Sequence, residues 1–342
     1  MPKHRSEESR VKLKDIAEAA GVSISTVSRA LSGHDSVSAK KRKEIMEIAK
    51  ETGYIASGKE TDRVLIAVGL PNADRYALRN PYFLEIIRGA YTVINRFSRL
   101  HLTIEDLSRL PELVGVTDGL LVLSPDDVHF DFERVRQLPT VVVDSLGPEW
   151  TVSVVVDNAA GTRMATEHVI LLGHQRVAYI GPRNTRTAEE RYEGYVKAHR
   201  DHNLTVGSDM AVFTRDSSFE EGYKACRELL SHERWPTAIV AFNDYMAWGV
   251  LSCCQEHGVK VPEDISLVGY DGIAQFPVTA LTRLTTVDQH AFEQGYTAAN
   301  VLIDLLSGHR PNTSVIQVTP NIVLGSTVVH PHELRELRGI LQ

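Results

Sequence analysis

The chain has 342 residues, 43% of them hydrophobic and 24% charged, which is an ordinary globular composition with length for about two or three domains. The first residues contain no apolar segment typical of a secretory signal, and no run approaches the roughly 18 apolar residues of a membrane span. We therefore expect a cytoplasmic protein with no membrane partner. The three cysteines show neither a disulfide framework nor metal-ligand spacing, so no metal is expected.

Charge is distributed unevenly along the chain. The net charge is −7, but residues 1–60 carry a net +3 and the remainder a net −10. A basic first segment on an acidic body is expected when only that segment meets DNA phosphates. A solvated charged surface would explain so small an excess almost as well, so charge alone does not decide.

Residues 13–54 show the periodicity of three short helices. Ile16, Ala17 and Ala20 fall at helical spacing, and Gly21 then breaks the run. Ser23 is a natural N-cap for a second helix. A third helix is expected after the SGHDSV loop, ending near residue 53.

The segment VKLKDIAEAAGVSISTVSRALSG has the spacing of a helix-turn-helix. Small alanines allow two helices to cross closely, and glycine permits the tight turn. The second helix then exposes Ile24, Ser25, Ser28 and Arg29 on one side, where a recognition helix meets base edges. A helical hairpin with a polar face is the alternative, but the extended pattern D-I-A-x-x-A-G-V-S-x-x-T-V-S-R-A-L is far more specific.

From residue 64 onward the chain alternates apolar strands with helical patterns. RVLIAVGL, DGLLVL, PTVVVDS, RVAYIGP, AIVAFND and ISLVGYD are continuous apolar runs that end in Gly, Pro, Asp, Asn or Ser. Continuous hydrophobicity suits strands covered on both faces, as in a parallel α/β sheet. Six or more such units exceed what one compact sheet needs, so we expect two lobes.

Polar side chains gather at the ends of these expected strands, where ligands bind in open α/β sheets. They are Asp144, Asn243, Asp244 and Asp271, and Arg191 follows one helical turn after Thr187. Carboxylates, an amide and a guanidinium converging between lobes suit a polyol. The alternative is that Asp and Asn cap the next helix or close a turn, which we expect of Asp157 and Asp244.

At this point the sequence resembles the lactose-repressor (LacI/GalR) family of transcription regulators. NPYFLEIIRGA, VVVDNAAGTRMATEHVILLGHQRVAYIGP, AFNDYMAWGVL, DISLVGYDG and LTRLTTVDQ extend the likeness over nearly the whole chain. The resemblance implies an α/β fold: a three-helix helix-turn-helix headpiece followed by a two-lobed periplasmic-binding-protein-like domain with parallel sheets (type I). It also implies a homodimer that binds double-stranded operator DNA under allosteric control.

The resemblance assigns roles residue by residue. Ile24, Ser25 and Arg29 would read bases, while Thr26 and Ser28 would contact phosphate or pack. The effector-binding set would be Asp144, Thr187, Arg191, Asn243 and Asp271, with Tyr82 and Phe83 as an aromatic wall that stacks on a sugar ring or a base.

The expected domain organisation follows from these elements. Residues 1–54 form the headpiece, 55–63 a short linker, 64–330 the effector-binding and dimerisation domain, and 331–342 a tail. The N-lobe takes about 64–157 and 289–319, and the C-lobe about 158–288 and 320–330. Leu334, Leu337 and Leu341 in the tail have heptad-like spacing, but the segment is too short for a dependable tetramerising coil.

Two features depart from the family pattern. The linker IASGKETDR lacks the Pro-Asn and the leucine of a hinge helix, and its Ser-Gly pair disfavours helix. The connection between HLTIED and DGLLVL is also short, so a helix of the N-lobe is expected to be stunted or absent.

The sequence therefore predicts a homodimeric repressor controlled by a small metabolite, a sugar or sugar derivative. The alternatives are a regulator controlled mainly by a partner protein, or a cytosolic solute-binding protein. No enzyme is expected: no G-x-S-x-G, Walker or G-x-G-x-x-G motif occurs, and no catalytic residue or cofactor can be named.

Overall fold

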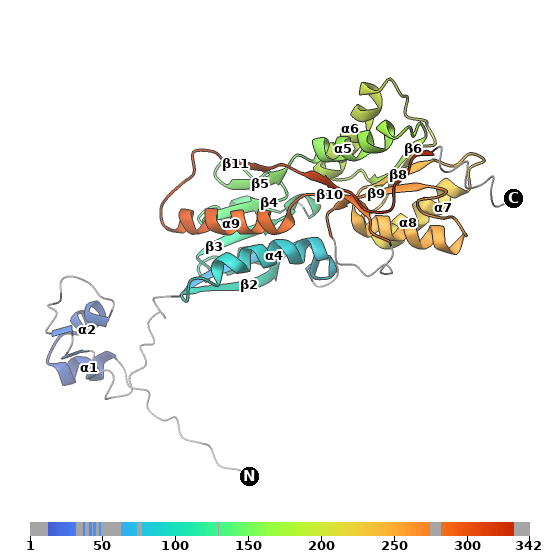
Figure 1. The fold of residues 1–342 in the computed structure, drawn as a ribbon. Helices are drawn as coiled ribbons and strands as arrows, with labels where there is room; N and C mark the ends of the chain where they lie inside the picture. Colours follow the sequence, from blue (N-terminus) through green and yellow to red (C-terminus); the bar gives the residue numbers. More distant parts are fainter. Residues whose placement is uncertain are drawn as a thin grey trace, which may run out of the picture. The chain divides into compact units, whose positions relative to one another are not determined.

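The computed structural model describes residues 13–31, 37, 41–42, 44–45, 48, 63–73, 77–128, 130–273 and 282–331. The chain divides into two units, Met1–Val64 and Leu65–Gln342 (Figure 1). The linker after residue 54 and the leucines of the tail lie outside the described residues, and so does most of the expected third helix.

The first unit contains the predicted helix-turn-helix pair, α1 (Leu13–Ala20) and α2 (Ile24–Leu31). Gly21 between them has φ +63°, the left-handed conformation that glycine adopts without strain. The Ser23 hydroxyl accepts a hydrogen bond from the Thr26 N–H at 3.2 Å, which confirms the predicted cap. The buried core of this unit consists of Ile16, Ala17, Ala20, Val27, Ala30, Val37 and Ile45, with Val22 and Ile48 packed against it.

The second unit contains two six-stranded sheets. The first runs in the order β11 (Val315–Val318), β5 (Val152–Val156), β4 (Thr140–Val143), β3 (Gly119–Leu123), β1 (Val64–Leu70) and β2 (Leu100–Asp106). Helices α4 (Pro81–Ile94) and α9 (Ala291–Leu306) pack together, and α9 contacts β3, β4 and β5 (Figure 1). All five residues of β3 are buried, as expected for a strand covered on both faces.

The short connection in this lobe forms no α-helix. Between β2 and β3 the chain makes the 3₁₀ helix η2 (Leu107–Leu113), which contains Pro111. Leu107 and Leu110 of η2 are fully buried in a core with Leu120 of β3 and Val135 of the 3₁₀ helix η4 (Phe132–Val135). The prediction of a stunted or absent helix is confirmed, because in this fully described stretch only the 3₁₀ helix η2 lies between β2 and β3.

The second sheet runs in the order β12 (Asn321–Val323), β10 (Thr285–Asp288), β9 (Ser266–Asp271), β8 (Ala238–Ala241), β6 (Val177–Pro182) and β7 (Ala211–Thr214). Helices α5 (Asn158–Leu171) and α6 (Arg186–Asp201) cover one face, and α7 (Phe219–Leu230) and α8 (Asp244–Glu256) the other. The sheet is not wholly parallel, because β12 pairs antiparallel with β10 at its edge. The three cysteines are free and buried between α7, α8 and the sheet.

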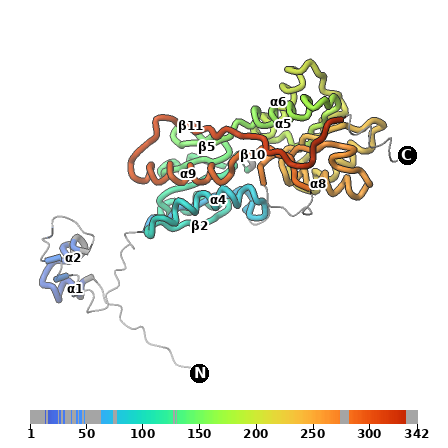
Figure 2. Tube along the Cα trace, in the orientation of Figure 1, coloured from blue at the N-terminus to red at the C-terminus, as the bar shows by residue number. Residues whose placement is uncertain are grey.

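The chain passes between the two sheets three times. The crossings follow β5 into α5, β10 into α9, and β11 into β12. Figure 2 shows the last of them as the red segment that leaves β11 for the other sheet. These crossings bring the carboxyl ends of the strands from both sheets to a common cleft, which is where the polar strand-end residues lie.

Candidate effector cleft and DNA-reading helix

Helix α2 carries all five predicted DNA-binding residues. Ile24 at its start is 49% exposed, so its side chain is accessible for contact with a base. Thr26 shares a hydrogen bond with Ser23 between their hydroxyl oxygens at 2.8 Å, so its side chain takes part in the cap. The side chains of Ser25, Ser28 and Arg29 lie outside the described part of the helix, so their DNA contacts stay predictions.

A cavity of about 400 Å³ lies between the two lobes of the second unit. Its walls include every predicted effector-binding residue: Tyr82, Phe83, Asp144, Thr187, Arg191, Asn243 and Asp271. The structure brings these residues together from α4, the end of β4, α6, the end of β8 and the end of β9. A volume of this size suits a small metabolite.

The backbone at three strand ends adopts the left-handed region. Ser124 after β3 has φ +43°, Asp144 after β4 has φ +65°, and Asp271 at the end of β9 has φ +124°. Non-glycine residues rarely adopt such angles, and the strain they cause clusters at binding sites. All three residues line the cavity, so the strained backbone is used to hold polar side chains in it.

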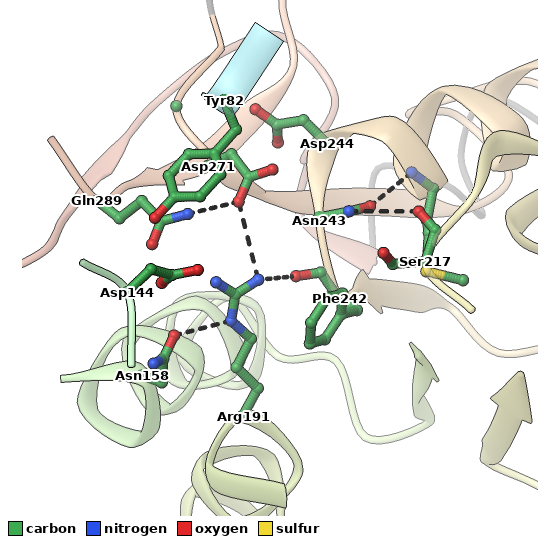
Figure 3. A network of polar contacts seen from close by, with 12 residues as sticks. Tyr82, Asp144, Asn158, Arg191, Ser217, Phe242, Asn243, Asp244, Asp271 and Gln289 are labelled. Atoms are coloured by element: carbon green, nitrogen blue, oxygen red, sulfur yellow. Dashed lines mark hydrogen bonds and ion pairs between the residues drawn. The ribbon is translucent and has the colours of Figure 1, made fainter. Parts of the chain in front are cut away.

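Arg191 is buried in the cleft and contacts residues from several elements that line it. Only 3% of its surface is exposed, and its guanidinium lies 3.7 Å from the ring centre of Tyr270 and 4.4 Å from that of Phe242. Its Nε donates to Asn158 Oδ1 at 2.9 Å, and its Nη1 donates to the Phe242 carbonyl at 2.6 Å (Figure 3). Two aromatic faces and two fixed acceptors leave the side chain a single orientation.

Two carboxyl groups face this guanidinium. Asp271 Oδ1 lies 3.8 Å from Arg191 Nη1 and accepts a hydrogen bond from Gln289 Nε2 at 2.7 Å. Asp144 Oδ2 accepts from the Ser124 hydroxyl at 2.7 Å. Burial raises the pKa of Asp144 above its ordinary value and raises the pKa of Asp271 well above it, although the nearby guanidinium lowers both.

The aromatic wall is positioned by the start of α4. Asn80 caps this helix by accepting a hydrogen bond from the Tyr82 N–H at 3.0 Å. The Tyr82 hydroxyl donates to Gln294 Oε1 at 3.4 Å, and its ring lies 5.4 Å from that of Phe83. Burial, with Asp144 and Asp271 nearby, raises the Tyr82 pKa well above its ordinary value, so the hydroxyl stays protonated.

The cap assignments at the end of β8 are exchanged relative to expectation. Asn243, and not Asp244, caps α8, because its Oδ1 accepts from the Met246 N–H at 2.8 Å. Asp244 instead accepts hydrogen bonds from the Thr286 hydroxyl at 2.5 Å and the Ile273 N–H at 2.8 Å. Asp244 therefore has a structural role, as expected, but it does not cap α8; Asp157 has the expected role as well, since it caps α5. Asn243 still lines the cavity.

Three of the residues that sequence reasoning missed hold predicted site residues in place. Gln289 and Ser124 line the cavity and hold Asp271 and Asp144, and Asn158 of α5 holds Arg191. Gln289 and Ser124 each follow a strand closely, so the rule that found Asp144 could have found them. Asn158 begins a helix, and only the three-dimensional contact reveals its role.

A second cavity, of about 320 Å³, adjoins the first. It shares Asp126, Asp144, Ser145 and Thr187 with the first cavity and is also lined by Leu146, Val315 and the Arg186–Glu190 ion pair. The cleft is therefore longer than the first cavity alone.

Comparison with known proteins supports the interpretation of both units. The model for bacterial regulatory proteins of the lacI family matches residues 12–57, and the periplasmic binding protein-like domain matches residues 166–328. The HTH-type transcriptional repressor CytR of Escherichia coli K12 is 32% identical, over 96% of this chain and 100% of the repressor. The chain belongs to the LacI family. The repressor PurR of Haemophilus influenzae Rd is 30% identical, over 92% of this chain and 98% of PurR.

Solved structures of LacI-family regulators have the same fold. A lac repressor dimer bound to operator and the anti-inducer ONPF aligns with a TM-score of 0.71 and 25% identity, over 94% of this chain and 100% of that chain. The regulator CelR in complex with cellobiose aligns with a TM-score of 0.68 and 27% identity, over 93% and 100%. As a member of this family the chain is a DNA-binding regulator and not an enzyme. Among the described residues, no helix is long and apolar enough to cross a membrane.

Proposed function

We propose that this LacI-family chain is a homodimeric repressor whose affinity for operator DNA is set by a sugar or sugar derivative bound between the two lobes. One observation carries the proposal: the polar strand-end residues expected to bind the effector all line a single cavity between the lobes. A buried guanidinium held between two aromatic rings, with carboxyl groups facing it, provides directional partners for hydroxyl groups.

The operator-reading part of the proposal rests on α2. The N-terminal half of a recognition helix presents side chains to base edges in the major groove. Ile24 is suited to a thymine methyl group and Arg29 to a bidentate contact with guanine. The names of the solved relatives, one bound to operator as a dimer and one to cellobiose, are consistent with the DNA, dimer and effector assignments.

DNA selection from random pools by the purified chain tests this assignment. Wild-type protein should enrich a two-fold-related sequence. Arg29→Ala should lose about 1–3 kcal/mol of specific binding and relax the preference at one position of each half-site. Lys14→Ala is the matched control, because Lys14 is an exposed cation on α1 with 72% of its side chain accessible. This variant should keep the selected sequence unchanged, and an Arg29→Ala protein that does the same would refute the assignment.

A further inference from the structure

Acidic residues outnumber basic residues in the lining of the effector cleft. Its main cavity is lined by four carboxylic acids, Asp126, Asp144, Asp216 and Asp271, and Arg191 is the single basic residue among the described lining residues. The adjoining cavity adds Asp157, Glu190 and Arg186, of which the last two pair with each other at 2.7 Å. Acidic side chains therefore outnumber basic ones throughout the cleft.

The single guanidinium of the main cavity is partly engaged by the protein, through two of its five N–H donors. Its Nε and Nη1 donate to Asn158 and to the Phe242 carbonyl, and Asp271 lies within ion-pair distance. An anionic ligand would have to compete with Asp271 and Asp144 for the same positive charge. Additional negative charge near two buried carboxyl groups is strongly unfavourable, because the dielectric response there is weak.

The cleft also contains hydrogen-bond acceptors that have no donor in the described part of the chain. Asp144 Oδ1 and Gln289 Oε1 are buried and accept no hydrogen bond from the described residues. The orientation of the Gln289 amide is fixed, since Nε2 donates to Asp271 and a flipped amide would set two oxygens against each other. Ser124 likewise fixes the other oxygen of Asp144. Asp144 and Gln289 both line the cavity, and Figure 3 shows their side chains near the guanidinium of Arg191.

Two orphaned acceptors in a ligand cleft require donors on the ligand, because a buried acceptor without a partner is costly. Hydroxyl, amino and ring N–H groups can donate to them. A phosphate dianion or a carboxylate group offers only acceptors, so such a group cannot serve as the partner of either oxygen and adds negative charge beside them.

Building on the proposed function, we propose that the cleft selects an uncharged or cationic effector that presents at least two hydrogen-bond donors to Asp144 and Gln289, and that it rejects phosphorylated and carboxylated metabolites. The burial of the carboxyl groups agrees with this selection. Burial raises the pKa of Asp271 well above its ordinary value, and Asp244 and Asp144 raise it further, because negative charge is poorly stabilised at this position.

Metabolite capture tests the inference with the whole range of small molecules that a cell contains. The immobilised full-length chain is incubated with a small-metabolite extract of bacterial cells, and retained compounds are identified by mass spectrometry. Thr187→Trp is the blank, because an indole at this cavity-lining position fills space and leaves the buried charges intact. Compounds retained by the wild type at least about tenfold above this blank should lack phosphate and carboxylate groups.

Asp144→Asn provides the second arm. It keeps the size of the side chain but exchanges one acceptor oxygen for a donor, so retention of the wild-type ligand should fall about tenfold. Enrichment of a phosphorylated or carboxylated compound, or undiminished retention by Asp144→Asn, would overturn the inference while leaving the proposed effector control standing. Retention of nothing above the blank would count against the proposed function itself.

Discussion

Asp244 is a buried carboxyl group that connects neighbouring segments of the C-lobe next to the cleft. It lies at the start of α8 and accepts hydrogen bonds from Ile273, just after β9, and from Thr286 of β10. It therefore connects three segments of the C-lobe next to Asp271. Burial raises its pKa to about 7 in spite of these hydrogen bonds, so it titrates near neutral pH.

The raised pKa of Asp244 predicts a pH-dependent stability. A carboxyl group with a pKa near 3.9 when unfolded and about 7 when folded binds protons more tightly in the folded state. Its contribution to stability is fully present below the unfolded pKa and is lost as the pH rises through 7. Between about pH 5.5 and 8.5 the wild type should lose about 2 kcal/mol of unfolding free energy through this group.

Urea unfolding of the wild type and Asp244→Asn at both pH values measures this loss. The amide oxygen of the variant can still accept from the Ile273 N–H, and its NH2 group can donate to the Thr286 hydroxyl, so its stability should stay close to that of the wild type at the lower pH and vary less with pH. Equal pH slopes for the two proteins would show that Asp244 does not titrate in this range.

The strand-end residues also show what sequence reasoning at this scale can and cannot do. Asp144 and Asp271 were predictable, because carboxyl ends of parallel strands meet at one edge. The exchange of roles between Asn243 and Asp244 was not. Whether either side chain caps the helix depends on Ile273 and Thr286, which are distant in sequence and reach α8 only in the folded C-lobe.

Close helix crossings determine the architecture at the level of elements. In the C-lobe, Gly222 of α7 and Gly249 of α8 lie where the two helices cross. A Cβ on Gly249 would overlap the Phe219 carbonyl oxygen, and one on Gly222 would overlap that of Met246. The α4–α9 and α5–α6 pairs also cross at glycines, so small residues set the helix spacing in both lobes.

Gly249→Ala should therefore destabilise the protein despite the higher helix propensity of alanine. Overpacking at a close crossing costs about 1–3 kcal/mol, which exceeds the roughly 1 kcal/mol gained from propensity. Gln255→Ala, at an exposed position of the same helix, is the control and should change the unfolding free energy by less than about 0.5 kcal/mol. Thermal or urea unfolding distinguishes the two, and a Gly249→Ala protein as stable as the wild type would mean that the helices can separate freely.

The secondary-structure elements were more predictable from the sequence than the roles of individual residues. Alternating apolar runs and helical patterns predicted two lobes of α/β structure, because continuous strands need cover on both faces. The short connection after β2 predicted the missing helix. The antiparallel pairing of β12 with β10 was not predictable, since three residues carry little pattern and the pairing depends on where the last crossing leads the chain.

The proposed function requires the DNA-reading unit and the cleft of the second unit to act together. Residues of both lobes hold the cleft: Tyr82, Asp144 and Gln289 come from the N-lobe or a crossing, and Arg191 and Asp271 from the C-lobe. An effector that contacts all of them favours one arrangement of the lobes over others. Such a ligand can change DNA affinity only by as much as its affinity differs between those arrangements.

The most direct test of this account is the affinity of the full-length chain for its selected operator, with and without a saturating amount of the captured metabolite, measured by fluorescence anisotropy at fixed salt. A coupling of about 1–3 kcal/mol predicts a change of about 5- to 150-fold in the wild type and none in Thr187→Trp, whose cavity is filled. An operator affinity that is the same with and without the metabolite in the wild type would contradict control through the cleft.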